Sequence, residues 1–136
     1  PMGNVKTRKH SFPDETCQIG IDFDGVIHKN SKGFFDGTVY DVPIEGVSRA
    51  LEMISKKYTI IVYSAKARKD RMLINEKTGV ELIWDWLDQH HLSKHVKEVT
   101  SEKPRAVCYI DDKAFRFTDW NSTIEDLIKH NIMEKE

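Results

Sequence analysis

Residues 19–28 read IGIDFDGVIH, an apolar, β-forming run that ends in two carboxylates one residue apart and is followed at once by a glycine. Residues i and i+2 of an extended chain point to the same side, so Asp22 and Asp24 can face one ligand. Gly25 lets the backbone leave the strand sharply, because glycine has no Cβ. The stretch therefore predicts a buried strand over residues 17–23 whose carboxyl end carries two acids.

The remaining apolar runs and turn signals predict an alternation of strands and helices. This order favours an α/β fold, a three-layer sandwich with a mainly parallel, Rossmann-like sheet. The strands are almost continuously apolar, so we expect helices on both faces of the sheet. The predicted elements are a helix over 44–57, a strand over 58–63, a basic helical stretch after Ser64 that ends near Gly79, a helix over 80–91, strands over 96–99 and 106–110, and a final helix that begins with a Ser122-x-x-Glu125 capping box.

Length and composition indicate one soluble domain. The 136 residues fit a single domain over 16–136 after a polar, flexible leader over 1–15. The formal net charge of -1 leaves any binding of nucleic acid or membrane to local patches. No apolar run approaches the roughly 20 residues that span a bilayer. Cys17 and Cys108 lie in apolar runs, so we expect buried free thiols in a reducing, cytoplasmic compartment.

Polar side chains follow three of the predicted strands. In a parallel α/β sheet, ligands bind at the carboxyl ends of the strands. An isolated Asp-x-Asp is usually a solvated turn, but several acids placed this way indicate one site. The side chains concerned are Asp22 and Asp24 after the first strand, Ser64 after the second, and Asp111 and Asp112 after the last, which Lys103 precedes.

These motifs resemble those of the haloacid-dehalogenase-like (HAD-like) superfamily of phosphohydrolases over about residues 19–117. The first motif of that family, an apolar strand that ends in Asp-x-Asp, is similar to residues 19–26. The second, an apolar strand that ends in Ser or Thr, is similar to residues 60–64. The third, a lysine, is similar to Lys103, and the fourth, an apolar strand that ends in paired acids, to residues 107–112. The resemblance implies an HAD-like fold and phosphomonoester hydrolysis.

The resemblance also implies roles for the acids. Asp22 would attack phosphorus to form an aspartyl-phosphate, and Asp24 would act as the general acid and base. A Mg²⁺ ion would relieve the repulsion between the crowded carboxylates and the phosphate. Its ligands would be a carboxylate oxygen of Asp22, the backbone carbonyl of Asp24 and one of the pair Asp111 and Asp112, with Asp111 as the first choice.

The other candidate residues have two interpretations each. Ser64 and Lys103 would bind and neutralise the phosphoryl group in the family. Ser64 could instead only cap the following helix, and Lys103 could be a plain surface lysine. The basic residues just beyond Ser64 could bind or steer an anionic substrate, although a solvated helix face is favoured; they are Lys66, Arg68, Lys69 and Arg71. His28 has no role in the pattern and is interpreted as an ordinary polar loop residue.

The chain looks capless. Residues 25–44 leave room for a turn and a small hairpin around 33–37, and the core itself needs the elements between 64 and 103. We therefore expect a Mg²⁺-dependent phosphatase with an open site for a phosphorylated small molecule or macromolecular end, and no membrane partner. A polynucleotide-end or phosphoprotein phosphatase is an alternative, with nucleic acid only as substrate, and so is a non-catalytic binding or regulatory domain. An oligomer through Trp84, Trp86 and Trp120 is left open.

Overall fold

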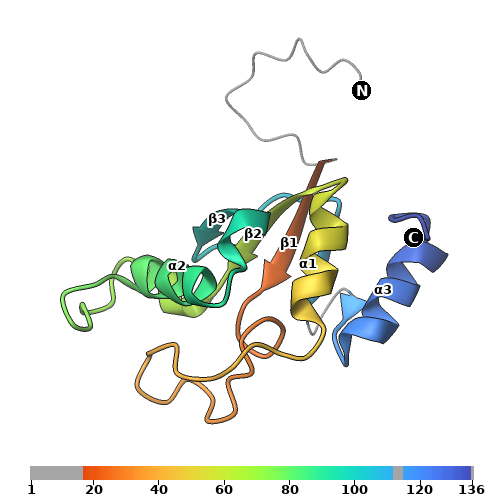
Figure 1. Cartoon of the computed structure of the whole chain (residues 1–136). Coiled ribbons are helices and arrows are strands. Elements are labelled where there is room, and N and C mark those ends of the chain that lie inside the picture. The colour runs from red at the N-terminus through yellow and green to blue at the C-terminus, as the bar shows by residue number, and fades with distance from the viewer. Residues whose placement is uncertain (1–16, 112–114, 136) are drawn as a thin grey trace, which may run out of the picture.

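The computed structural model describes residues 17–111 and 115–135. They form an α/β fold around a four-stranded, all-parallel sheet in the order β3-β2-β1-β4, and a two-residue strand β5 extends the sheet beside β4. The prediction of a parallel α/β sheet is thus confirmed, whereas the leader predicted over 1–15 lies outside the described residues. The elements, drawn in Figure 1, are β1 (Gln18–Asp22), α1 (Val47–Ser55), β2 (Thr59–Tyr63), the 3-10 helix η2 (Ala65–Ala67), α2 (Gly79–Gln89), the 3-10 helix η3 (Ser93–His95), β3 (Val96–Thr100), β4 (Cys108–Asp111), β5 (Phe115–Arg116) and α3 (Trp120–Lys129).

Alternate residues of a strand point to the same face of the sheet, and on one face of this sheet those residues are apolar. The register places Ile19 beside Ile60 and Ile21 beside both Val62 and Ile110. These side chains are buried in one core cluster. Each buried aliphatic side chain of this size stabilises the fold by about 1.5–3 kcal/mol relative to exposure.

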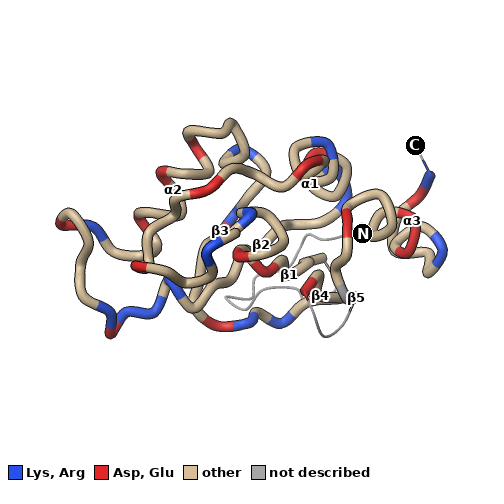
Figure 2. Tube along the Cα trace, turned by 90° about the horizontal axis from the view of Figure 1, so that it is seen from below, with Lys and Arg blue, Asp and Glu red and all other residues tan. Residues whose placement is uncertain are grey.

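All three described helices cover this same face, as the view along the sheet in Figure 2 shows. Leu51 of α1, Leu87 of α2 and Leu127 of α3 belong to the same core as the strand residues. The prediction of a three-layer sandwich with helices on both faces is therefore wrong for the described residues. The chain adds β2 beside β1 and then β3 beside β2, so it moves across the sheet in one direction. Right-handed crossovers that move in the same direction place their helices on the same face.

The second face is covered by the connection from β3 to β4, residues 101–107, which is too short for a helical layer. The Lys103 ammonium lies 4.6 Å from the centre of the Tyr109 ring on this face. A Cβ on Gly20 in β1 would lie 2.9 Å from Tyr109 and 3.2 Å from Pro104. Glycine at this position thus lets the connection lie directly against the strand.

Local capping decides where two helices begin. The predicted capping box at Ser122 is wrong, because Asp119 caps α3 one turn earlier and accepts a hydrogen bond from the Ser122 N–H at 2.8 Å. The earlier start lets the buried Trp120 reach the core. A capping box occurs instead at α2, where Thr78 Oγ1 accepts from the Glu81 N–H and Glu81 Oε1 accepts from the Thr78 N–H.

The basic stretch after Ser64 is not the predicted helix. Beyond η2, residues 68–78 contain two turns and an isolated bridge between Ile74 and Lys77 but no helix, and Asn75 and Glu76 have left-handed backbone φ angles of 52° and 67°. A right-handed helix cannot pass through such residues. Residues 33–37 are likewise turns and not a hairpin.

The cysteines and tryptophans follow the sequence-based expectations only in part. Cys108 is buried, and burial raises its pKa to about 11, as in an inert thiol. Cys17 is exposed, which corrects the prediction that both thiols are buried. Trp86 and Trp120 are buried and Trp84 is half-buried, so these side chains serve the core more than an external contact surface.

Across the part of the chain that the structure describes, none of the helices has the length and hydropathy that a membrane crossing requires.

The first prediction concerns Gly79, the first residue of α2. A Cβ there would lie 1.6 Å from the backbone oxygen of Lys66. Because backbone atoms cannot swing aside, we expect Gly79→Ala to lower the free energy of unfolding by about 2 kcal/mol or more, measured by urea denaturation. Gly33→Ala is the control, because a Cβ added at Gly33 would meet nothing within 4 Å. Gly33 has a φ of 68°, so this substitution should cost only the left-handed backbone penalty of about 1–2 kcal/mol. A smaller loss for Gly79→Ala than for Gly33→Ala would contradict the close packing of α2 on η2.

Candidate functional site

The carboxyl ends of three adjacent strands bring the predicted polar residues to one edge of the sheet. Asp22 is the last residue of β1 and Asp111 the last residue of β4. These strands are adjacent and parallel, and their register places the two ends at the same level. Ser64 directly follows β2, on the other side of β1. Asp112, the second acid of the predicted pair, lies outside the described residues.

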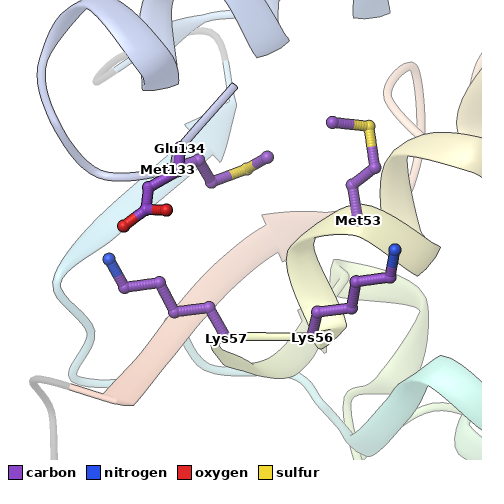
Figure 3. A pocket seen from close by; sticks show the side chains of 5 residues that line it. All are labelled: Met53, Lys56, Lys57, Met133 and Glu134. Carbon is purple, nitrogen blue, oxygen red and sulfur yellow. The ribbon is translucent and has the colours of Figure 1, made fainter. Parts of the chain in front are cut away.

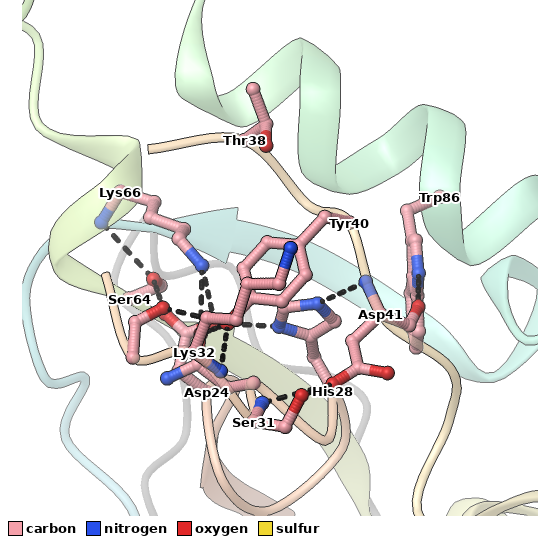
Figure 4. A network of polar contacts seen from close by, with 12 residues as sticks. Asp24, His28, Ser31, Lys32, Thr38, Tyr40, Asp41, Ser64, Lys66 and Trp86 are labelled. Atoms are coloured by element: carbon pink, nitrogen blue, oxygen red, sulfur yellow. Dashed lines mark hydrogen bonds and ion pairs between the residues drawn. The ribbon is translucent and has the colours of Figure 1, made fainter. Parts of the chain in front are cut away.

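Asp24 is the centre of a polar network at this edge, shown in Figure 4. Its Oδ2 accepts a hydrogen bond from Ser64 Oγ at 3.0 Å. Its Oδ1 lies 2.9 Å from both Lys66 Nζ and His28 Nδ1. Three side chains therefore hold this carboxylate, one from the loop after β1 and two from the segment after β2.

Lys66 is almost completely buried, with 1% of its side chain exposed. Its Nζ donates to Asp24 and also to Asn30 Oδ1 at 3.2 Å, and it lies 5.6 Å from the centre of the Tyr40 ring. A buried ammonium is strongly unfavourable unless it is paired and hydrogen-bonded. Lys66 is therefore part of the network around Asp24, and the interpretation of this lysine as part of a solvated basic face is wrong.

His28 is fully buried, which contradicts its interpretation as an ordinary loop residue. Its Nε2 accepts a hydrogen bond from the Asp41 N–H at 3.0 Å, so the ring proton lies on Nδ1 and is donated to Asp24. The imidazole stacks on Phe23 with 5.3 Å between ring centres, and Trp86 contacts it edge-on at 5.4 Å. The surrounding rings thus fix the direction in which His28 donates.

The surroundings of Asp24 keep its carboxyl group ionised. Burial by itself raises the pKa, but hydrogen bonds from His28, Lys66 and Ser64, together with the charge of Lys66, outweigh burial and lower the pKa below its usual value of 3.8. At neutral pH Asp24 is therefore a proton acceptor. It can donate a proton only after it has first taken one up.

A second ion pair joins the third and fourth sequence motifs. Lys103 Nζ lies 3.0 Å from Asp111 Oδ2, and the Tyr63 hydroxyl donates to the same oxygen. The Lys103 side chain is 40% exposed, whereas Asp111 is buried. Lys103 is thus not a plain surface lysine, because it joins a buried acid to a surface that a ligand can reach.

Arg68 is not brought into either set of contacts. Its guanidinium pairs with Asp70, with NH2 2.8 Å from Oδ2, and both side chains are mostly exposed. The prediction that Arg68 binds substrate therefore has no support from its surroundings.

The acids at this edge would hold a magnesium ion only together with substrate and water as further ligands. Mg²⁺ in proteins is usually bound by one or two carboxylates and completes its octahedron with waters and phosphate oxygens. Asp22 and Asp111 would supply two carboxylates from adjacent strand ends, and Lys103 and Tyr63 already contact Asp111 Oδ2. Both carboxylate oxygens of Asp24 accept hydrogen bonds, which leaves its backbone carbonyl. Within residues 17–111 and 115–135, no group of three His, Cys, Asp or Glu side chains is arranged to hold a metal ion on its own.

A pocket lies at the opposite edge of the sheet, between the end of α1 and the start of β2 (Figure 3). Its lining combines two methionines with two lysines and one glutamate. It holds a single acid and none of the candidate residues from the sequence, so the candidate site remains at the carboxyl ends of the strands. The lining residues are Met53, Lys56, Lys57, Met133 and Glu134.

Comparisons of the chain with protein-family models, with curated proteins and with solved structures found no match. The function is therefore inferred from the motifs and from the contacts described above.

The second prediction concerns His28. Removal of its ring in His28→Ala opens a cavity beside Phe23 and leaves the Asp41 N–H without its acceptor. We expect the free energy of unfolding to fall by about 3 kcal/mol or more, measured by urea denaturation. His130→Ala is the matched control, because His130 is exposed near the end of the chain, and it should change stability by no more than about 0.5 kcal/mol. Equal effects of the two substitutions would contradict the role of His28 in the core of the site.

The third prediction concerns stability in acid. A carboxyl group whose pKa is lower in the folded chain than in the unfolded chain stabilises the fold above the unfolded pKa, and this contribution is lost as pH falls through the folded pKa. For Asp24 the unfolded value is close to 3.8, so we expect the stability advantage of the wild type over Asp24→Asn to be constant near neutral pH and to shrink below about pH 4. Asp41, whose pKa is lowered to about 2 by hydrogen bonds from Ser31, adds an acid-induced loss that both proteins share.

Urea denaturation of both proteins between about pH 3 and pH 7 makes this comparison. A stability difference between them that stays constant over the whole range would contradict the assignment of a lowered pKa to Asp24.

Proposed function

We propose that this chain is a Mg²⁺-dependent phosphomonoester hydrolase with a Rossmann-like, HAD-like fold, and that it acts through an aspartyl-phosphate on Asp22. The observation that carries this proposal is the placement of Asp22 and Asp111 at the same level on the ends of adjacent parallel strands. Each of the two neighbouring acids, Asp24 and Asp111, has a lysine partner, Lys66 or Lys103.

The strand order supports this location for a phosphate site. From β1 the chain adds β2 and β3 on one side, and then returns to add β4 on the other side of β1. The order of the strands therefore reverses between β1 and β4. Ligands of open α/β sheets bind outside the carboxyl ends of the strands at such a reversal, which here is the point where Asp22 and Asp111 lie.

The proposed reaction has two displacements at phosphorus. An oxygen of Asp22 would attack the phosphorus of the substrate, the bond from phosphorus to the alcohol oxygen would break, and the alcohol oxygen would take a proton from the protonated form of Asp24. Water then attacks the same phosphorus, which releases inorganic phosphate and restores the Asp22 carboxylate. Bound Mg²⁺ would offset the negative charge that gathers between the carboxylates and the phosphoryl oxygens.

The ionised state of Asp24 suits the second displacement. Asp24, which its donors keep ionised at neutral pH, would accept the proton of the attacking water. For the first displacement Asp24 would need to take up a proton, and its donors Ser64 and Lys66 would then be free to turn toward the phosphoryl oxygens. Lys103, which is partly exposed, supplies positive charge from the other side of β1.

A non-catalytic binding domain is the second candidate function. The engagement of both Asp24 oxygens by Ser64, Lys66 and His28 favours it, because such a network stabilises the fold without any reaction. The two candidates differ in whether phosphate is released.

The fourth prediction tests the proposed function. Wild-type protein should release phosphate from a generic aryl phosphate in the presence of Mg²⁺ and not after chelation. Asp22→Asn should lower this rate at least about a thousandfold, because it removes the nucleophile. Asp70→Asn, which alters an exposed aspartate paired with Arg68, is the matched control and should keep the wild-type rate.

Phosphate release by Asp22→Asn at the wild-type rate would rule out the covalent route. Absence of metal-dependent release from the folded wild type would favour the non-catalytic domain.

A further inference from the structure

Large apolar side chains are exposed on the two segments that border the Asp24 network. Phe34 and Phe35 lie in the loop after β1 and are 50% and 60% exposed. Met72 and Leu73 lie in the segment after η2 and are exposed as well. Figure 1 places both segments at the edge of the sheet to which the strands point. Exposed apolar side chains grouped beside a candidate site indicate a surface that contacts a ligand.

Each of the two exposed aromatic rings has a cation against it. The Arg71 guanidinium lies 4.7 Å from the centre of the Phe34 ring, and Lys32 Nζ lies 4.7 Å from the centre of the Phe35 ring. These four residues, Lys32, Phe34, Phe35 and Arg71, are named the aromatic rim. A cation lies over each ring, and about half of the surface of each phenylalanine remains exposed to solvent.

The aromatic rim is connected directly to the candidate site. Arg71 NH1 donates to the backbone oxygen of Lys66 at 2.9 Å, and Lys66 Nζ donates to Asp24. On the other side, the Phe35 ring meets Tyr40 edge-on at 5.7 Å, and the Lys66 ammonium lies 5.6 Å from the Tyr40 ring. The aromatic rim is therefore joined to the Asp24 network through Lys66 and Tyr40.

The combination of flat rings and cations selects among the possible anionic substrates. A nucleobase stacks on an open aromatic face, and nearby lysine and arginine side chains attract its phosphates. The phosphorylated segment of a protein would gain as much from aliphatic side chains as from rings. The rim therefore favours a substrate that carries a base over one that carries an apolar peptide segment.

We propose that the aromatic rim binds the nucleobase of a nucleotide-type phosphomonoester, whose phosphate reaches Asp22. This inference rests on the proposed function, which it makes more specific by naming the substrate class. A free mononucleotide and the phosphorylated end of a single-stranded oligonucleotide share this chemistry. The net charge of -1 for the whole chain is compatible with such a ligand, because binding draws on local cations.

The fifth prediction tests the rim by binding, in an Asp22→Asn background that prevents turnover. The probe is a fluorescently labelled, single-stranded oligothymidylate with a 5′-phosphate, and its binding is followed by fluorescence anisotropy. Thymidine 5′-monophosphate and ribose 5-phosphate serve as competitors. We expect the compound that carries a base to compete at least about tenfold better than the sugar phosphate, because stacking adds to phosphate binding. Equal competition by the mononucleotide and the unlabelled oligonucleotide would assign the free nucleotide as substrate, and better competition by the oligonucleotide would assign the nucleic-acid end.

Variants of the rim separate stacking from simple apolar contact. Replacement of both Phe34 and Phe35 by leucine keeps apolar bulk but removes the flat faces, and we expect it to weaken probe binding at least about tenfold. Lys32→Ala should also weaken binding. Lys57→Ala should not, and it is the matched control because Lys57 also lies over an aromatic ring, that of Tyr58, at the opposite edge of the sheet.

Three outcomes would overturn the proposal: unchanged binding by the double leucine variant, equal competition by ribose 5-phosphate, and, with a phosphopeptide as a further competitor, better competition by the peptide than by thymidine 5′-monophosphate. Failure of the proposed function is recognised separately. If the wild type hydrolyses no aryl phosphate but the aromatic rim still binds the base, the proposal for the rim is kept and the phosphatase assignment fails. If aryl phosphate is hydrolysed and the rim variants bind like the parent, only the rim proposal fails.

Discussion

The buried ion pair between Lys66 and Asp24 is the constraint on which the rest of the site depends. An ammonium group removed from water is unfavourable by several kcal/mol unless a carboxylate and further acceptors surround it. The loop after β1 and the segment after β2 must therefore stay together. Gly79 makes this possible, because α2 begins directly against the Lys66 backbone, where a Cβ would collide with the carbonyl group. The packing of α2 against Lys66 and the pairing of Lys66 with Asp24 therefore depend on each other.

Two pairs of opposite charge flank the end of β1. Lys66 with Asp24 lies toward the face that the helices cover, since the ring of His28 joins this pair to the core residues Phe23 and Trp86. Lys103 with Asp111 lies on the face that the β3–β4 connection covers. A dianionic phosphate at the end of β1 would meet a lysine on each side, which reduces the repulsion from the carboxylates. The one-sided arrangement of the helices leaves Lys103 near the surface.

The contacts also explain why the sequence predicted some features of the site and not others. The strands, their parallel arrangement and the acids at their ends follow from local patterns, namely β-branched apolar runs that stop at polar residues. The arrangement of the layers could not be predicted from these local patterns. Ile61 and Tyr63 are buried like residues beneath a helix, although a loop covers their face of the sheet. A continuous run of apolar residues indicates that a strand is buried on both faces, but it does not indicate whether a helix or a loop covers each face.

The amino-acid sequence alone was enough to locate Asp22, Ser64 and Asp111 at one edge of a parallel sheet, since periodicity and strand ends are local properties. Only the folded chain decided that His28 and Lys66 are buried against Asp24, because those contacts join positions about forty residues apart or depend on rings such as that of Trp86. A single histidine or lysine in a loop has the same local pattern whether it faces water or a carboxylate. Its burial is settled by which distant side chains pack around it, and that information appears only when the tertiary contacts form.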